Sequence, residues 1–251
     1  MKFLKKYLSS IILFLVILTC FELVNALGLI RSSILPPPSS VLHAFINYRS
    51  EIIVHAAYTM LEVMLGIMIA LILGIAASIV LYFSKPLRRA LYPVLVVSHI
   101  IPIIALAPLL ILWFGFGILP KIIVVVIYSF FPITATFSDG LLDTPQHLID
   151  YGKSLGVSRL QALRYINFPA SMPQFFSGLK LAAIYSVSGA VVGEYVGAYK
   201  GLGILLQTSA NSRATALMFA TVATIVGLTL LSVGVVIVVE KSVLSWRSYE
   251  K

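Results

Sequence analysis

The chain has 251 residues, of which 60% are hydrophobic and only 11% are charged, whereas soluble domains average about 45–50% apolar and 25% charged residues. This composition excludes an ordinary soluble domain, which needs more polar surface. The formal net charge of +9 does not indicate nucleic-acid binding, because the basic residues are spread along the chain instead of forming one patch.

Six apolar blocks approach the roughly 20 residues that a helix needs to cross a bilayer. We expect spans at residues 8–30, 57–83, 90–114, 122–142, 178–198 and 214–239. Long apolar blocks favour helices over the alternating pattern of a membrane β-barrel. The sequence therefore predicts an all-α, polytopic membrane protein with about six transmembrane helices, forming a single domain over residues 1–251.

The first block follows three lysines, as a signal peptide does, but no convincing small-residue cleavage site comes after it. We expect it to be retained as a helix. The third block, which continues without a charged residue to Pro120, and the last block are the clearest spans.

Basic residues indicate the orientation. With the amino terminus inside, most lysines and arginines fall in cytoplasmic segments, including Lys85, Arg88, Lys153 and Arg159, and few, such as Lys121, fall in outer loops. The positive-inside rule therefore predicts that both termini are cytoplasmic.

The segment 144–169, between the fourth and fifth spans, is too polar to cross the membrane. Thr144 is a suitable N-cap, and Pro145 suits the first helical position. Leu148 and Leu155 recur at helical spacing, so a short amphipathic helix is expected up to Gly156. Such a helix either lies on lipid or fills a groove on a soluble partner.

A second short helix is expected directly after Gly156. Ser158 and Gln161 have the spacing of a capping box, and Pro169 is expected to end this helix after Phe168. The segment thus reads as a helix, a glycine hinge and a second helix on the cytoplasmic face.

The spacing of Gly156, nine residues and then Ile166-Asn167-Phe168-Pro169 resembles the cytoplasmic loop signature of binding-protein-dependent permeases. That signature reads Glu-Ala-Ala, three residues, Gly, nine residues, Ile, any residue, Leu, Pro. Here Asp150, Tyr151 and Gly152 stand in place of Glu-Ala-Ala, and Phe168 in place of Leu. The resemblance assigns ATPase coupling to Asp150, Tyr151, Gly152, Leu155, Gly156, Ser158, Ile166 and Pro169.

Further segments resemble the nitrate, sulfonate and taurine branch of these permeases in order and spacing, among them the proline-rich residues 35–41 and residues 107–117. The stretch 113–133 is similar to permeases for thiamine-type pyrimidine precursors. The implied substrate is a small organic or inorganic solute.

The resemblance implies a type I ABC importer permease in the bacterial inner membrane, which forms the translocation path as a homodimer. Its implied partners are a cytoplasmic ABC ATPase dimer, an extracytoplasmic solute-binding protein and membrane lipid. The chain is expected to be a non-catalytic subunit without a cofactor, because it lacks a Gly-x-x-x-x-Gly-Lys-Ser/Thr loop; ATP and Mg²⁺ would bind the partner ATPases.

The alternative is a secondary transporter or channel driven by an ion gradient. It would need an ionisable relay in the bundle core, and the two halves lack the matched broken segments of many such transporters.

Two carboxylates in apolar blocks are candidates for the translocation path or a gate, because ionisable groups are costly in a membrane. Glu194 either acts in gating, including by holding the Gly201-Leu202-Gly203 loop, or meets the interface; Glu62 lies near the expected outer boundary. Tyr185 either stacks on a planar substrate or anchors the interface. His55 and His99 have no partner at metal-ligand spacing, so no metal site is expected.

Overall fold

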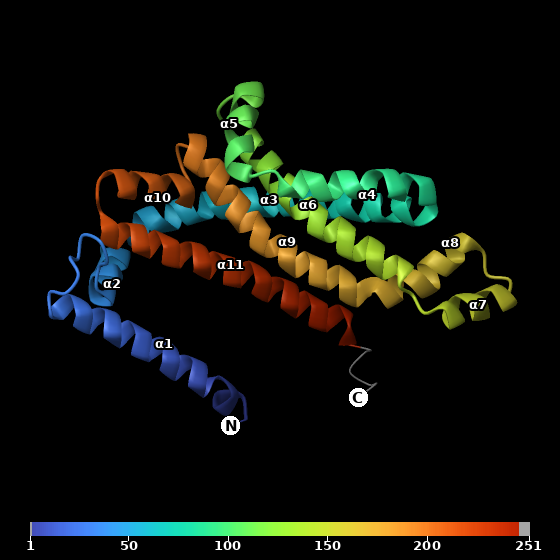
Figure 1. The fold of residues 1–251 in the computed structure, drawn as a ribbon, viewed down its shortest axis with the longest axis horizontal. Helices are drawn as coiled ribbons and strands as arrows, with labels where there is room; N and C mark the ends of the chain where they lie inside the picture. Colours follow the sequence, from blue (N-terminus) through green and yellow to red (C-terminus); the bar gives the residue numbers. More distant parts are fainter. Residues whose placement is uncertain (1, 246–251) are drawn as a thin grey trace.

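The computed structural model of the chain describes residues 2–245, and within that range the regular secondary structure is entirely helical (Figure 1). The helices are α1 Lys2–Ala26, α2 Pro38–Asn47, α3 Arg49–Phe83, α4 Lys85–Ile100, α5 Ile103–Phe114, α6 Leu119–Leu142, α7 Gln146–Ser154, α8 Arg159–Ala162, the π-helix η1 Leu163–Asn167, α9 Phe168–Gly197, α10 Leu202–Asn211 and α11 Thr215–Val243. The predicted all-α class is confirmed.

Four helical stretches among the described residues are long and apolar enough to cross a bilayer: α3, α6, the continuous run from α8 through α9, and α11. They coincide with the second, fourth, fifth and sixth predicted spans. The first predicted span falls on α1, which lies beside the bundle and contacts it through α2 (Figure 1). A carboxylate supports that contact, because both oxygens of Glu22 on α1 accept hydrogen bonds from Ser39 on α2.

The third predicted span, 90–114, is wrong as an uninterrupted helix. α4 ends at Ile100 and α5 begins at Ile103, with an extended backbone at Ile101 and Pro102 between them. Proline lacks an N–H and disfavours a helical conformation in the residue before it, so Pro102 ends α4. The absence of charge in this block concealed the break. As a result α5 leaves the bundle at a steep angle to α4 (Figure 1).

The centre of the bundle is α6, which packs against α3 and α9. Glycines permit the close approach: a Cβ on Gly66 of α3 would overlap Val125 of α6, and one on Gly74 would lie 2.7 Å from Ile133. In lipid, such van der Waals packing between small residues holds helices together, because burial from water does not contribute.

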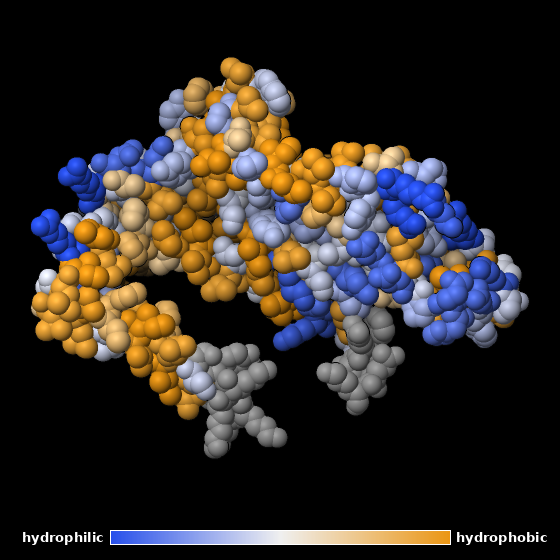
Figure 2. All heavy atoms as spheres, viewed as in Figure 1, coloured by the Kyte–Doolittle hydropathy of each residue, from blue (hydrophilic) through white to orange (hydrophobic). Residues whose placement is uncertain are grey.

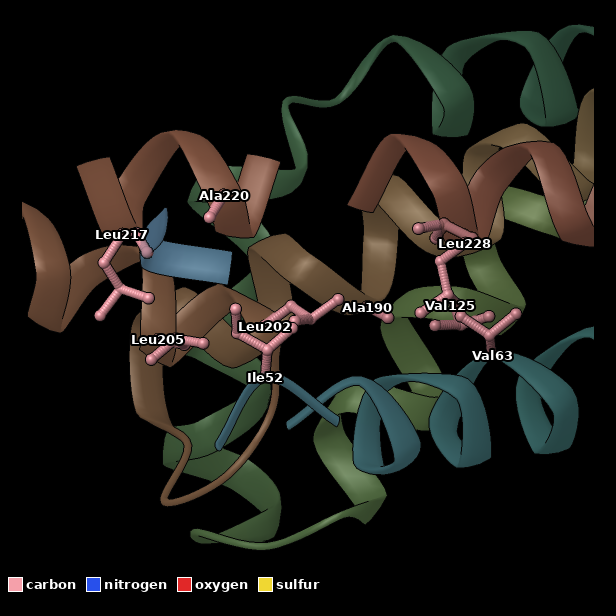
Figure 3. Close-up of a cluster of buried hydrophobic side chains, with 11 residues drawn as sticks. Ile52, Val63, Val125, Ala190, Leu202, Leu205, Leu217, Ala220 and Leu228 are labelled. Carbon is pink, nitrogen blue, oxygen red and sulfur yellow. The ribbon is translucent and has the colours of Figure 1, made fainter. Parts of the chain in front are cut away.

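Two clusters of buried side chains fill the bundle. One joins α3, α6, α9, α10 and α11 and includes Val63, Val125, Ala190, Leu202 and Leu228 (Figure 3). The other, near the opposite end, is built around Phe137 of α6, whose ring packs edge-on against Phe168 and Phe175 of α9.

Hydrophilic residues gather over the end that carries α7, α8 and the start of α4, and a smaller group lies at the opposite end, with more apolar residues between them on the visible face (Figure 2). We name these the α7 end and, opposite, the α10 end. Near the α7 end Lys180 of α9 and Glu240 of α11 form an ion pair at 3.0 Å.

Candidate functional site

The segment between α6 and α9 consists of the short helices α7, α8 and η1 and projects from the bundle; we call it the α7–η1 loop (Figure 1). α7 ends in a Schellman motif: Val157 N–H donates to the Gly152 carbonyl at 3.0 Å and Gly156 N–H to the Lys153 carbonyl at 2.9 Å. Gly156 has φ of +72°, which glycine adopts without the steric cost that other residues meet. The predicted termination of the first helix at Gly156 is confirmed.

The predicted capping box is also present. The Ser158 hydroxyl accepts from Gln161 N–H at 3.4 Å, and Ser158 N–H donates to Gln161 Oε1 at 2.8 Å. Together these bonds satisfy two N–H groups that have no intrahelical partner. α8 therefore starts where the local sequence indicates.

Two details of the predicted loop are wrong. Thr144 does not cap α7: its side chain is buried and its hydroxyl donates to the Leu141 carbonyl at 3.4 Å, while Pro145 takes the N-cap position. Pro169 does not end the second helix, because α8 passes through the wider π-turn of η1 directly into α9. Proline is tolerated there, in the first turn of α9.

Asn167 and Arg159 fasten the loop to the membrane helices. The buried Asn167 amide donates to the Leu141 carbonyl at 3.0 Å and accepts from the Tyr82 hydroxyl at 3.2 Å. Arg159 donates to the Tyr82 carbonyl at 3.0 Å and lies over the rings of Tyr82 and Phe83. Neither anchor was predicted from the sequence; the signal was Asn167 itself, a polar residue at the unrestricted position of the loop signature.

The outer face of the loop is apolar at its centre. Tyr151, Leu155, Leu160 and Tyr165 are each about two-thirds exposed, and Tyr151 and Leu155 are among the predicted coupling residues. Large apolar side chains on an otherwise polar end are typical of a surface that docks a partner.

Charge borders this apolar centre. Lys153 forms a 3.0 Å ion pair with Asp150, and Gln146 donates to the same carboxylate oxygen. The hydrogen bonds from Lys153 and Gln146 lower the pKa of Asp150 below its usual value. Of the remaining predicted coupling residues, Gly152 is buried against the tip of the half-buried Ile166, and Pro169 is exposed.

Toward the α10 end, the candidate gate residues form a buried polar network. Glu194 of α9 accepts from Gly203 N–H and from the Thr59 hydroxyl of α3, both at 2.6 Å. Thr59 in turn accepts from Leu202 N–H at 2.8 Å, and Gly201 N–H donates to His55 Nδ1 at 3.0 Å. The turn from α9 into α10 is thus held by α3 and by its own preceding helix.

Glu62 belongs to the same region but pairs differently. Its carboxylate forms a 3.1 Å ion pair with Lys121 of α6, and both side chains are buried. Lys121, which was expected in an outer loop, lies instead in the first turn of α6 and is paired with Glu62 inside the bundle. The two residues are 59 positions apart, so no local pattern indicated the pair.

Tyr185, the remaining candidate, lies elsewhere. It is half-buried on α9 and its ring packs edge-on against His99 of α4, with 5.3 Å between ring centroids. Among the described residues no cluster of three or more His, Cys, Asp or Glu side chains could hold a metal ion.

Comparisons with known proteins agree with this architecture. Residues 63–245 match the family described as binding-protein-dependent transport system inner membrane component. A probable ABC transporter permease protein of Haemophilus influenzae is 37% identical over 226 residues, covering 90% of this chain and 92% of the relative.

The formylaminopyrimidine transport permease protein ThiX of Halalkalibacterium halodurans is 34% identical over 78% of each chain. Among solved structures, a chain of the MetNI methionine ABC transporter in an inward-facing conformation superimposes with a TM-score of 0.66, at 20% identity, over 74% of this chain and 93% of that chain. This last likeness concerns the fold.

Proposed function

The chain belongs to the family of binding-protein-dependent transport system inner membrane components, and from that premise we propose how this permease subunit of an ABC importer couples to its motor. Its α7–η1 loop seats in a groove of a cytoplasmic ATPase subunit, with Tyr151 and Leu155 as the inserted side chains. The observation that carries the proposal is the exposure of these two apolar residues on a loop fastened to three membrane helices.

The loop is built to transmit force. Asn167 and Arg159 tie it to the ends of α6 and α3, and η1 continues without a gap into α9. A displacement of the loop is therefore carried into the central helices α3, α6 and α9, which pack against one another. This geometry suits a subunit that converts ATP binding by a partner into movement of its own helices.

The proposed assembly has two copies of this chain, two ATPase subunits that bind ATP and Mg²⁺, and an extracytoplasmic solute-binding protein. The α7 end and both termini face the cytoplasm, as the distribution of lysine and arginine predicts. At the α10 end, Glu194, Glu62, Gly201 and Gly203 control access to the path. Family membership favours this assembly over a secondary transporter or channel that works alone.

For the solute, we propose a small planar pyrimidine. The support is the relative ThiX, a formylaminopyrimidine transport permease that matches 78% of this chain at 34% identity. Uptake of labelled formylaminopyrimidine by cells that express the whole system tests the proposal, with taurine as the competing solute from the other branch. Uptake of taurine alone would contradict it.

Two glycines provide a matched test of the loop. Gly156 and Gly28 have almost the same φ, +72° and +68°, no atom within 4 Å of a Cβ placed on them, and an N–H that donates to the carbonyl three residues earlier at 2.9 Å. Proline is incompatible with both, since its φ is fixed near −65°. Only Gly156 lies in the loop.

We expect Gly156→Pro to abolish co-purification of the ATPase, and Gly28→Pro to retain it, while both variants still insert into the membrane. Asp150→Lys, which reverses a charge beside the apolar centre, should weaken association as well. If Gly156→Pro bound the ATPase as well as the wild type does, the assignment of the loop to ATPase coupling would be contradicted. An equal loss of ATPase binding in Gly28→Pro would also contradict it.

Orientation is tested separately. The single cysteine of the chain, Cys20, is exposed on α1, so a Cys20→Ser background leaves one reporter thiol in Lys153→Cys. We expect a membrane-impermeant maleimide to label this thiol in inverted vesicles and not in intact spheroplasts. Labelling from outside would overturn the cytoplasmic placement of the loop.

A further inference from the structure

The break between α4 and α5 lies in a stretch that contains no Asp, Glu, Lys or Arg from Ala90 to Pro120. Irregular backbone at membrane depth is tolerated where it is buried in protein or lines a water-filled cavity. In other transporters, broken helices mark the places where solutes bind. The surroundings of Ile101 and Pro102 are therefore a candidate ligand site.

Four rings from three helices gather beside this break. His99 of α4 stacks on Phe131 of α6 with 4.7 Å between centroids and 20° between planes. Tyr185 of α9 and Tyr128 of α6 approach His99 at 5.3 and 5.5 Å, and each other at 6.4 Å. All four residues are half-buried, so the cluster lies at the boundary of the bundle.

Hydrogen bonds connect the cluster to the break between α4 and α5. The Tyr128 hydroxyl accepts from Ile103 N–H, the first residue of α5, at 3.0 Å and donates to the Ile101 carbonyl at 3.4 Å. Tyr128 thus satisfies backbone groups that the interrupted helix leaves open. A movement of α5 relative to α4 would act directly on the rings.

Within the part of the chain that the structure describes, one buried polar atom in the cluster lacks a hydrogen-bond partner. His99 Nδ1 is buried and has no hydrogen-bond partner among the described residues. Buried polar atoms are nearly always paired, so an unpaired one calls for a specific explanation. A bound ligand that hydrogen-bonds to the imidazole supplies that explanation.

We propose that His99, Tyr128, Phe131 and Tyr185 form a binding site for a planar, nitrogen-bearing aromatic solute within the membrane. Such a ring that stacks on Phe131 beside the edge of His99 gains an aromatic contact, and its ring nitrogen or amino group pairs with Nδ1 in the plane of the imidazole. The site contains no lysine or arginine, so it offers no ion-pair partner to a sulfonate. This inference deepens the proposed function and rests on it for the identity of the solute.

The test is direct binding to the full-length chain in lipid nanodiscs, measured by calorimetry with formylaminopyrimidine as the probe and taurine as the comparison. We expect His99→Leu and Tyr185→Leu each to raise the Kd for the pyrimidine about tenfold or more, since each removes a ring contact. Phe131→Leu removes the other stacking face and should raise the Kd by a similar factor.

The matched control is Phe14→Leu on α1, which removes an exposed aromatic ring away from the site and should not change the Kd. Melting temperatures of every variant check that folding is retained. Absence of pyrimidine binding by the wild type overturns the proposal, as does equal binding by the cluster variants or taurine binding with the same dependence on His99 and Tyr185.

Association with the ATPase is measured on the same preparations. If the ATPase co-purifies and no pyrimidine binds, the solute site is refuted while the coupling function stands. If the pyrimidine binds through the cluster and no ATPase associates, the site stands and the proposed coupling fails.

Discussion

The side-chain amide of Asn167 donates a 3.0 Å hydrogen bond to the backbone carbonyl of Leu141, which fastens the last turn before α9 to the end of α6. The two residues lie 26 positions apart, and both groups are buried. The bond closes the α7–η1 loop into a rigid unit whose movement is shared by two central helices.

Asn167→Leu should therefore uncouple transport from ATP hydrolysis. It removes the acceptor of the Tyr82 hydroxyl and leaves the buried Leu141 carbonyl with only the 3.4 Å bond from the Thr144 hydroxyl, at a cost of about 1–3 kcal/mol, but it does not alter the exposed face of the loop. We expect normal ATPase capture and severalfold less solute moved per ATP in proteoliposomes. Tyr82→Phe removes only the 3.2 Å bond to Asn167 and should have a smaller effect. Wild-type stoichiometry in Asn167→Leu would refute this role.

The contact between Gly152 and Ile166 sets the distance between α7 and η1. A Cβ on Gly152 would lie 2.8 Å from Ile166 Cδ1, which is the far end of a flexible side chain. We expect Gly152→Ala to be tolerated, because the Ile166 tip can rotate and alanine favours the helix by about 1 kcal/mol. Gly152→Leu should separate the two helices and abolish ATPase capture.

The double variant Gly152→Ala with Ile166→Val provides the check, since valine lacks the Cδ1 atom that the new methyl group meets. It should capture the ATPase at least as well as Gly152→Ala alone. If Gly152→Leu retained full capture, the packing of α7 on η1 would have no part in coupling.

The approach of α10 to α9 depends on Gly203. A Cβ there would overlap the Val191 carbonyl and lie 2.8 Å from Glu194 Cβ and 2.9 Å from Tyr195 N. Two of these atoms belong to the backbone and cannot turn away. Gly203→Ala should push α10 outward, break the bond from Gly203 N–H to Glu194, and destabilise the chain by about 1–3 kcal/mol.

Gly227 on α11 is the matched control, because nothing lies within 4 Å of a Cβ placed on it. Gly227→Ala should keep or raise the melting temperature, whereas Gly203→Ala lowers it and reduces solute uptake. Equal melting and uptake in the two variants would show that α10 tolerates displacement and that the Glu194 contact does not hold a gate.

Local signals predicted the parts of the structure that depend on neighbours in sequence. The Schellman ending at Gly156 and the box between Ser158 and Gln161 each involve residues a few positions apart, and both are present. Hydropathy placed the long helices for the same reason, because a span is recognised from its own residues.

The features that sequence reasoning missed depend on distant partners or on competing local signals. The ion pair of Lys121 with Glu62 and the anchor from Arg159 to Tyr82 join helices far apart in the chain. Pro102 was a visible signal for a break, but the uncharged stretch around it favoured an uninterrupted span. Thr144 fitted an N-cap, yet its hydroxyl bonds the Leu141 carbonyl at the end of α6 instead.

The buried pair of Glu62 and Lys121 leads to a prediction on stability. Removing one member of a buried ion pair strands the other charge, which typically costs about 3–5 kcal/mol, whereas replacing both by apolar residues is often neutral or stabilising. We expect Lys121→Met to lower the melting temperature of the purified chain markedly, and Lys121→Met with Glu62→Leu to restore it.

The exposed pair of Lys153 with Asp150 has nearly the same length as the buried pair, 3.0 Å against 3.1 Å. Lys153→Met is therefore the control, and it should not change the melting temperature, because water screens an exposed pair. A wild-type melting temperature in Lys121→Met would mean that Glu62 finds another partner or solvent, and the bundle at the α10 end would then have to admit water.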